Sequence, residues 1–211
     1  MAFTDRTEGG QQLADRLMEA DVDPELVCAI PRGGLPVGRA VADRFGVPLD
    51  VVVATKLGAP SNPELAIGAV AGDGSYWLND EFVDRLRVDD DYIESERERE
   101  AEVARQKVAD YRGGEPLPDV AGKRVVLVDD GIATGATAIA CLRQLQASDA
   151  EAVLLAVPVA PASARAELGD EADRVVIVDE PRPFQAVGRH YREFGQVTDA
   201  EAIDLLEDSC V

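Results

Sequence analysis

The sequence predicts an α/β fold built on a doubly wound parallel sheet, with a hairpin insertion and a small C-terminal lobe. Short apolar runs alternate along the 211 residues with segments of helical periodicity. The runs are apolar at successive positions, as strands buried on both faces of a parallel sheet require. Two of the runs lead directly into glycine-containing turns that open a helix, which is where such sheets bind ligands.

The first half of the chain contains one strand–helix–strand unit. A helical pattern over residues 8–20 precedes the apolar run 26–30, and a second helical pattern over 37–45 ends at Gly46. The valine-rich run 49–55 is predicted as the second strand of the unit. Because a crossover helix joins the two strands, we expect them to lie parallel in one sheet.

A hairpin and a long charged helix are predicted next. Residues 64–71 and 75–78 flank Gly72-Asp73-Gly74, a turn sequence typical of hairpins. Residues 89–112 form a solvated, heavily charged helix that ends at Gly113-Gly114. Its thin apolar stripe consists of Ile93, Val103 and Val108.

The second half of the chain repeats the alternation of strands and helices. Strands are predicted at 124–128, 152–157 and 174–178, and helices at 136–145, 161–168 and about 199–207. Most of the remaining aromatic side chains fall between the last strand and the last helix. No internal repeat or linker divides the sequence, so we expect a single domain over residues 1–211.

The charge balance excludes one class of partner. Asp and Glu number 41 against 21 Lys and Arg, which gives a formal net charge of −20. A surface of this sign repels phosphate backbones, so nucleic-acid binding through a broad basic face is not expected. Only Lys56, Lys107 and Lys123 are lysines, and this composition resembles halophilic proteins of concentrated salt. An ordinary acidic protein is the alternative.

Cysteine usage and hydropathy indicate a cytoplasmic setting. Cys28, Cys141 and Cys210 show no paired spacing, which argues against a disulfide framework or a zinc site. The start of the sequence has no signal pattern, and no stretch reaches the roughly 18 apolar residues that a membrane span needs. We therefore expect a soluble, cytoplasmic protein.

The strongest chemical signal is the segment from Val125 to Thr137, where an apolar strand runs into the adjacent carboxylates Asp129 and Asp130. Glycines then allow a tight turn, and the amides and threonine hydroxyls at the next helix start form a nest for a phosphate. Ionised carboxylates accept hydrogen bonds from hydroxyls, so the pattern predicts a sugar phosphate site. The alternative is an ordinary strand-to-helix turn; the spacing fits neither GxGxxG nor a P-loop.

This segment, VVLVDDGIATGAT, resembles the signature of type I phosphoribosyltransferases. The resemblance implies phosphoribosyl pyrophosphate (PRPP) as the ligand, with Mg²⁺ bound to its pyrophosphate rather than in a protein cage. Asp129 and Asp130 would act as catalytic residues that hold the ribose hydroxyls, and any contact with Mg²⁺ would pass through water. The 5-phosphate would be bound by Ala133, Thr134, Gly135, Ala136 and Thr137.

The same resemblance assigns two further segments to the pyrophosphate. Arg32, Gly33 and Gly34 form a turn after the first strand, with a generic turn as the alternative. Lys56 follows the run 49–55, where it would supply a catalytic cation; a surface lysine at a strand end is the alternative. The resemblance also implies a flap over about 57–80 that closes over PRPP, and a hood over about 180–211.

The acceptor is the least defined part of the site. The resemblance implies a nucleobase or a similar nitrogen compound, with Asp179, Phe184 and Tyr191 as base-binding candidates. Aromatic residues that only build the core are the alternative. His190 is expected to be structural rather than catalytic, in a patch with Arg182, Arg189 and Arg192. Members of this family often form homodimers, and the sequence leaves the assembly open.

Two functions from different classes are compatible with these features. The first is a Mg²⁺-dependent phosphoribosyltransferase of purine or pyrimidine salvage that releases pyrophosphate. The second is a non-catalytic regulatory protein that senses PRPP or a nucleotide. A regulator of this type needs a DNA-binding appendage or a basic face, and the sequence shows neither. The enzyme is therefore the leading hypothesis.

Overall fold

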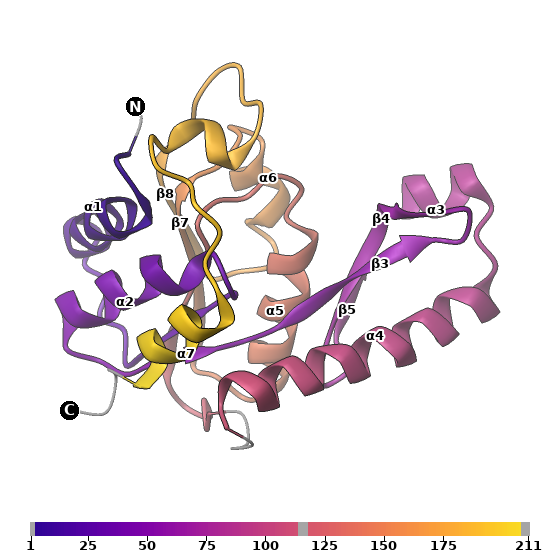
Figure 1. The fold of residues 1–211 in the computed structure, drawn as a ribbon, viewed down its shortest axis with the longest axis horizontal. Helices are drawn as coiled ribbons and strands as arrows, with labels where there is room; N and C mark the ends of the chain where they lie inside the picture. The colour runs from indigo at the N-terminus through magenta and orange to yellow at the C-terminus, as the bar shows by residue number, and fades with distance from the viewer. Residues whose placement is uncertain (1–2, 114–117, 208–211) are drawn as a thin grey trace.

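The computed structural model describes residues 3–113 and 118–207, which form a five-stranded parallel sheet with helices on both faces and an arm that projects to one side (Figure 1). The strand order is β2-β1-β6-β7-β8, and every pairing within this sheet is parallel. The α/β class and the doubly wound parallel sheet predicted from the sequence are confirmed. In that order the strands are Leu49–Val51, Leu26–Ala29, Arg124–Val128, Ala152–Val159 and Arg174–Asp179.

The chain changes direction within the sheet between β1 and β6. From β1 it moves outward to β2, and after the arm it returns to β6 on the other side of β1. All four residues of β1 and four of the five residues of β6 are buried, which accounts for their uninterrupted apolar sequences. In open α/β sheets, ligands bind in the crevice at such a reversal, beyond the carboxyl ends of the strands.

Helices cover both faces of the parallel sheet. The core under α1 and α2 contains Val126 of β6, whereas the core under α5 and α6 contains the next residue, Leu127. Successive side chains of one strand therefore enter two different cores, as the pleat of a strand dictates. These helices are α1 (Arg6–Glu19), α2 (Gly34–Phe45), α5 (Ala136–Ala147) and α6 (Ala164–Leu168).

The arm consists of a three-stranded antiparallel sheet, in the order β3-β4-β5, and two helices. Figure 1 shows this sheet and the long helix α4 reaching away from the parallel sheet. A hydrophobic cluster around Leu57, Ile67 and Val70 belongs to the arm itself. The predicted hairpin is confirmed as β4 and β5. The elements are β3 (Ala54–Ala59), β4 (Asn62–Ala71), β5 (Tyr76–Leu78), α3 (Asp80–Leu86) and α4 (Asp90–Tyr111).

The run 49–55 is not a single strand, and that prediction is wrong. β2 ends at Val51, and β3 begins at Ala54 in the other sheet, where it pairs antiparallel with β4. Val52 and Val53 are buried at the junction, so no polar residue marks the point where the chain leaves the parallel sheet. An apolar run indicates burial but does not show that its residues share one sheet.

Two details of the helices in the arm also differ from the prediction. Val103 is 36% exposed, because it lies off the helical face that is buried in α4. The buried stripe consists of Ile93, Ala101, Ala104 and Val108. Helix α3 has no counterpart among the predicted helices, although Asn79 caps it by accepting a hydrogen bond from the amide of Phe82 at 3.0 Å.

The C-terminal segment ends in α7 (Asp199–Glu207), which has the predicted bounds and packs against α2. The predicted end of the long helix at Gly113 is confirmed by a φ of +61° there, while Gly114 lies outside the described residues.

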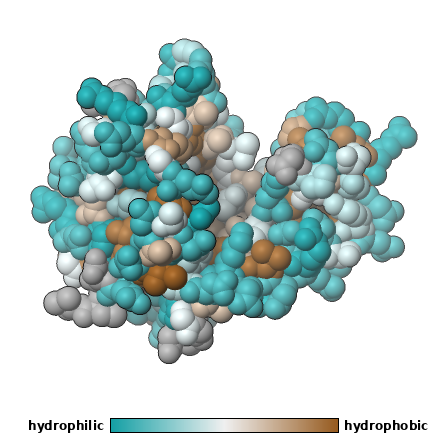
Figure 2. Space-filling model, in the orientation of Figure 1, coloured by the Kyte–Doolittle hydropathy of each residue, from teal (hydrophilic) through white to brown (hydrophobic). Residues whose placement is uncertain are grey.

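Over the described ranges, no helix combines the length and apolarity required to cross a membrane. Figure 2 shows a mostly hydrophilic face on which hydrophobic residues form small, separate patches.

Candidate functional site

Asp129 and Asp130 stand directly after β6, at the crevice where the chain direction reverses. The amide of Asp130 donates to Oδ1 of Asp129 at 2.7 Å, which holds the first carboxylate against the backbone. The second carboxylate is held by Arg6, whose Nε donates to Oδ2 of Asp130 at 2.8 Å. Sequence reasoning missed Arg6, since nothing at the start of α1 indicates a partner 124 residues away.

The loop after the two aspartates is tightly built and leads into α5. The amide of Ile132 donates to the carbonyl of Val159 at 3.0 Å, and a Cβ on Gly131 would lie 2.8 Å from Cγ1 of Val159. Gly135 is the N-cap of α5 and has a φ of +78°, a left-handed conformation that favours glycine. The local geometry therefore requires both glycines.

A pocket of about 170 Å³ lies over this loop and is lined by Asp129 and residues 131–138. It includes the first turn of α5, where the leading amides have no intrahelical acceptor and no side chain caps the helix. The side chain of Thr134 is exposed and that of Thr137 is half-buried. The pocket thus combines amide donors, two hydroxyls and a carboxylate, which are groups suited to a phosphate and to adjacent hydroxyls.

The turn after β1 packs directly against the two aspartates. A Cβ on Gly33 would overlap the carboxylate of Asp130, and a Cβ on Gly34 would lie 3.0 Å from the carbonyl oxygen of Val128. The peptide bond between Pro31 and Arg32 is cis. The structure therefore brings together the turn 31–34, the aspartate pair and the loop 131–137, three segments that the sequence analysis assigned to one ligand.

The two carboxyl groups differ in their electrostatic surroundings. Removal from water, followed by the neighbouring charge of Asp130, raises the pKa of Asp129 well above its ordinary value. Removal from water also raises the pKa of Asp130, but the hydrogen bond and charge of Arg6 act in the opposite direction. Asp130 is therefore the member of the pair that holds its negative charge more readily.

Arg32 borders a second pocket of about 510 Å³, between the turn, the end of α4 and the start of α7. Its Nη1 lies 3.5 Å from Oδ2 of Asp199, and the hydroxyl of Tyr111 donates to Oδ1 of the same residue at 3.0 Å. Burial, followed by the hydrogen bond to Asp199, raises the pKa of Tyr111 to about 12. Lys107 also lines this pocket, and sequence reasoning missed it because it belongs to a helix rich in exposed charged residues.

Lys56 lies elsewhere than the sequence predicts. It is an inner residue of β3, where it pairs with Ala69 in the antiparallel sheet, and not the residue after a parallel strand. Its side chain is exposed, while its neighbours Thr55 and Leu57 are buried. Lys56 does not line the 510 Å³ pocket beside Arg32. The error follows from the wrong assignment of the run 49–55 to one strand.

The three base-binding candidates occupy different surroundings. Asp179 ends β8 and is half-buried, as is Phe184. The ring of Phe184 stacks on His190 with centroids 5.5 Å apart, which gives the lone histidine an aromatic neighbour. Tyr191 is only 6% exposed, packs against Phe3 at 5.3 Å, and donates its hydroxyl to the carbonyl of Asp130 at 2.5 Å. Its contacts connect the C-terminal segment to the aspartate pair.

Replacing Tyr191 with phenylalanine is expected to lower the free energy of unfolding by about 1–3 kcal/mol, because the change leaves the carbonyl of Asp130 without this donor. Urea denaturation measures the loss. The matched control is Tyr92→Phe, which removes a hydroxyl that donates to the carbonyl of Gly58 in the arm at 2.9 Å, beside a less buried ring. A Tyr191 variant no less stable than the Tyr92 variant would contradict the role given to this hydrogen bond.

The site offers few protein ligands for a metal ion. Within the part of the chain that the structure describes, no group of three or more His, Cys, Asp or Glu side chains is placed to hold a metal. Two carboxylates meet at Asp129 and Asp130, and Arg6 contacts one oxygen of the second. A magnesium ion that enters on a diphosphate fits this donor set, since Mg²⁺ prefers phosphate oxygens and water to a protein cage.

Comparison with known proteins agrees with this geometry. The family profile described as "Phosphoribosyl transferase domain" matches residues 8–188. The Mycobacterium tuberculosis H37Rv protein named "Putative phosphoribosyl transferase Rv0571c" is 42% identical over 206 residues, which are 97% of this chain and 46% of that protein. Its counterpart in strain CDC 1551 gives the same values, so the chain spans about half the length of the curated relatives it matches.

One solved structure resembles nearly the whole chain. The crystal structure of TT1426 from Thermus thermophilus is 40% identical in sequence, has a TM-score of 0.84 and aligns over 99% of both chains. The fold of the arm and of the parallel sheet is therefore shared with a protein seen by experiment. Together with the family match over residues 8–188, these findings show that the chain belongs to the phosphoribosyl transferase domain family.

Proposed function

We propose that this protein transfers the 5-phosphoribosyl group of PRPP to a nucleobase or a similar nitrogen acceptor and releases pyrophosphate. The observation that supports this most strongly is the meeting of the turn 31–34, the aspartate pair and the loop 131–137 at one crevice. A ligand bound there would meet hydrogen-bond donors suited to a phosphate in the loop 131–137 and carboxylates that accept from hydroxyls at the aspartate pair. The turn 31–34 would offer it a second site for an anion. PRPP has these three parts in this order.

Each segment has a distinct part in the proposed complex. The amides of residues 133–137 and the hydroxyls of Thr134 and Thr137 bind the 5-phosphate. Asp129 and Asp130 accept hydrogen bonds from the ribose hydroxyls. Arg32 and the amides of Gly33 and Gly34 bind the pyrophosphate, and Mg²⁺ enters as part of this substrate. The proximity of Gly33 to Asp130, and the pocket over residues 131–138, support this division of roles.

The reaction exchanges one bond at the anomeric carbon for another. The bond from C1 to the pyrophosphate oxygen breaks, a bond from C1 to the acceptor nitrogen forms, and the nitrogen loses its proton. Positive charge develops on the ribose in the transition state, so the site must orient the sugar and neutralise the leaving pyrophosphate. The aspartates and the phosphate loop orient the sugar, and Arg32 binds the leaving group.

The arm and the C-terminal segment are proposed to complete the site. We propose that the flap at 57–80 closes over PRPP and brings Lys56 to the pyrophosphate, which protects the reacting centre from water. The acceptor would bind between Asp179 and the hood at 180–211, with the partly exposed ring of Phe184 available for stacking. The buried Tyr191 supports the aspartate pair and is not assigned to the acceptor.

The proposed reaction is tested by supplying PRPP, Mg²⁺ and a panel of purine and pyrimidine bases, at low and at high KCl concentration. Release of pyrophosphate that depends on one of the bases is the expected result. Tight PRPP binding by calorimetry without release for any acceptor would favour the sensor instead. A protein that fails to bind PRPP under any of these conditions would overturn both hypotheses.

Replacing Asp199 with asparagine is expected to tighten PRPP binding by up to about fivefold, the value of a partly exposed ion pair. The change removes the carboxylate 3.5 Å from Arg32, so the guanidinium no longer divides its interactions between α7 and the pyrophosphate. Calorimetry of wild-type and variant proteins measures the difference. Glu207→Gln removes the same charge at the other end of α7 and serves as the control. An equal change in both variants would show a general charge effect only.

A further inference from the structure

We propose that Arg6 is a positioning residue, which holds the carboxylate of Asp130 in the orientation that a ribose hydroxyl would meet; this role rests on the function proposed above. The residue is the first of α1, and its guanidinium is fixed on three sides. Nε donates to Asp130 at 2.8 Å, Nη1 donates to the carbonyl of Gly195 at 2.7 Å, and the guanidinium carbon lies 3.9 Å from the ring centroid of Phe194. Such contacts hold a long side chain in one rotamer.

The ion pair is shielded from solvent. The side chain of Arg6 is 12% exposed and that of Asp130 is 14% exposed, whereas the neighbouring pair of Arg16 and Glu19 on the same helix is largely exposed. A shielded charge pair is screened less by salt and is more sensitive to the loss of one partner. The ion pair between Arg6 and Asp130 is therefore energetically different from the surface ion pairs of this acidic protein.

The pairing leaves part of the carboxylate for a ligand. Among the described residues, hydrogen bonds to the side chain of Asp130 reach Oδ2 only. Gly33 packs against the same carboxylate on the side of the turn, so the group cannot rotate freely. With Oδ2 held by Arg6, Oδ1 is the atom that can accept a hydrogen bond from a ribose hydroxyl. Arg6 thus orients Asp130 without competing for that oxygen.

The charged and titratable groups around Asp130 come from three elements. Asp129 precedes it and disfavours a second negative charge, and Arg6 approaches from α1. Tyr191 approaches from the C-terminal segment and binds the backbone carbonyl of Asp130 rather than its carboxylate. Arg6 is the cation whose charge lowers the pKa of both aspartates. Without it, removal from water would favour two neutral acids at the position where an anion must accept the ribose hydroxyls.

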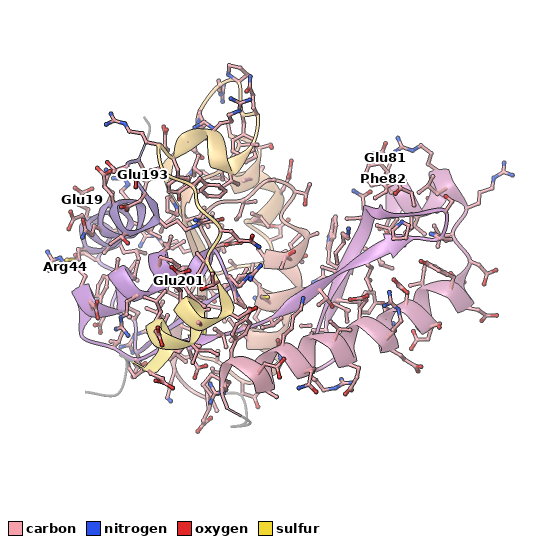
Figure 3. The ribbon with its side chains drawn as sticks, in the orientation of Figure 1. Glu19, Arg44, Glu81, Phe82, Glu193 and Glu201 are labelled. Carbon is pink, nitrogen blue, oxygen red and sulfur yellow. The ribbon has the colours of Figure 1, made fainter. Side chains whose placement is uncertain are left out.

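The C-terminal segment holds Arg6 in place through the backbone. The amides of Arg192 and Glu193 donate to the carbonyls of Phe3 and Thr4 at 2.9 and 2.8 Å, so this segment runs beside the start of α1. Figure 3 labels Glu193 on this segment near α1 and Glu201 further along on α7. The same segment supplies Gly195 and Phe194 to Arg6 and Tyr191 to Asp130. A displacement of the hood would therefore reach the aspartate pair directly.

The experiment compares Arg6→Met, Arg6→Lys and the control Arg16→Met, which removes an exposed arginine from the same helix. The carboxyl carbon of Asp130 is titrated by NMR without ligand, and the Kd for Mg²⁺-PRPP is measured against pH. We expect Arg6→Met to raise the pKa of Asp130 and to weaken PRPP binding by up to about tenfold, the effect of one pKa unit, at pH values where Asp130 is ionised in the wild type but protonated in the variant. The weakening should shrink as pH rises and Asp130 ionises. Arg6→Lys should restore most of the affinity.

Several outcomes would overturn the proposal. An unchanged titration of Asp130, or a loss of affinity that is equal at every pH, would give Arg6 a merely structural role. In the background of Asp130→Asn, adding Arg6→Met should cause no further loss of binding, and an additive loss would also contradict the proposal. If the wild-type protein binds no PRPP, the proposed function fails, while the ligand-free titration still decides whether Arg6 sets the charge of Asp130.

Discussion

Replacing Asp129 and Asp130 together with asparagine is expected to weaken PRPP binding by at least about 100-fold. The estimate follows because each hydrogen bond to a charged group contributes about 1.5–3 kcal/mol, and the change affects two such groups. Asparagine keeps the shape of aspartate but lacks its charge, so the ribose hydroxyls lose their strongest acceptors. Calorimetry with Mg²⁺-PRPP measures the loss. The control is Asp170→Asn, at an exposed position after α6.

The double variant is expected to stay folded, and its cost in stability arises at Asp130, where the change removes the partner of Arg6. The pKa of Asp129 is raised in the folded protein, so the stability that this group contributes is present at low pH and is lost as pH rises from the ordinary aspartate range through the raised value. An asparagine side chain at this position cannot ionise, which removes that loss. Urea unfolding at acidic and neutral pH should therefore show that Asp129→Asn gains stability relative to wild type as pH rises. If stability instead falls as much as binding, the aspartates have a structural role.

The substitution Gly33→Ala is expected to weaken PRPP binding by about 100-fold and to reduce the free energy of unfolding by about 1–3 kcal/mol, as overpacking of a closed site does. The backbone of Gly33 has a φ of −61°, which alanine adopts easily, so the effect comes from the new methyl group alone. That methyl would overlap the carboxylate of Asp130 at Oδ2, the oxygen that Arg6 already contacts.

The control for this substitution is Gly195→Ala, because a Cβ there would meet no atom within 4 Å and the change keeps the backbone carbonyl that accepts from Arg6. Urea unfolding and calorimetry are performed on both variants. A Gly33→Ala protein that binds PRPP as tightly as the Gly195 variant would show that the turn and the aspartate pair are not packed as described. The comparison separates local crowding from any general effect of replacing glycine.

The parts of the site that the sequence predicted share one property: each lies within a short continuous segment. Val125–Thr137 contains a strand, two carboxylates, a glycine turn and a helix start, so local patterns are sufficient to identify it. Arg6 has no such pattern, because its role arises only when the start of α1 meets the carboxylate that follows β6. The predicted position of Lys56 is wrong for a related reason. The valines before it are buried both in the parallel sheet and at the junction with the antiparallel sheet, so the sequence does not show where one sheet ends and the other begins.

The aromatic residues of the C-terminal segment also show that a local sequence pattern does not reveal long-range contacts. The sequence shows that Phe184 and Tyr191 are available to stack on a ring, but not whether their faces are covered. Tyr191 packs against Phe3 and Phe194, residues from opposite ends of the chain, and its hydroxyl binds a backbone carbonyl that no side-chain pattern can indicate. The strand order likewise depends on long-range pairing, although the alternation of strands and helices predicted the class of sheet.

The separate hydrophobic cluster of the arm has a thermodynamic consequence. Leu57, Ile67 and Val70 pack with one another rather than with the core of the parallel sheet, and the arm meets α5 in a separate junction, where Ala69 and Trp77 pack against Ala136 and Ala140. Such a division favours two cooperative units, so amide hydrogens of β4 should exchange through a partial opening that leaves β1 and β6 protected. We expect such a partial opening to release the arm as a unit while the crevice at the end of β6 keeps its shape.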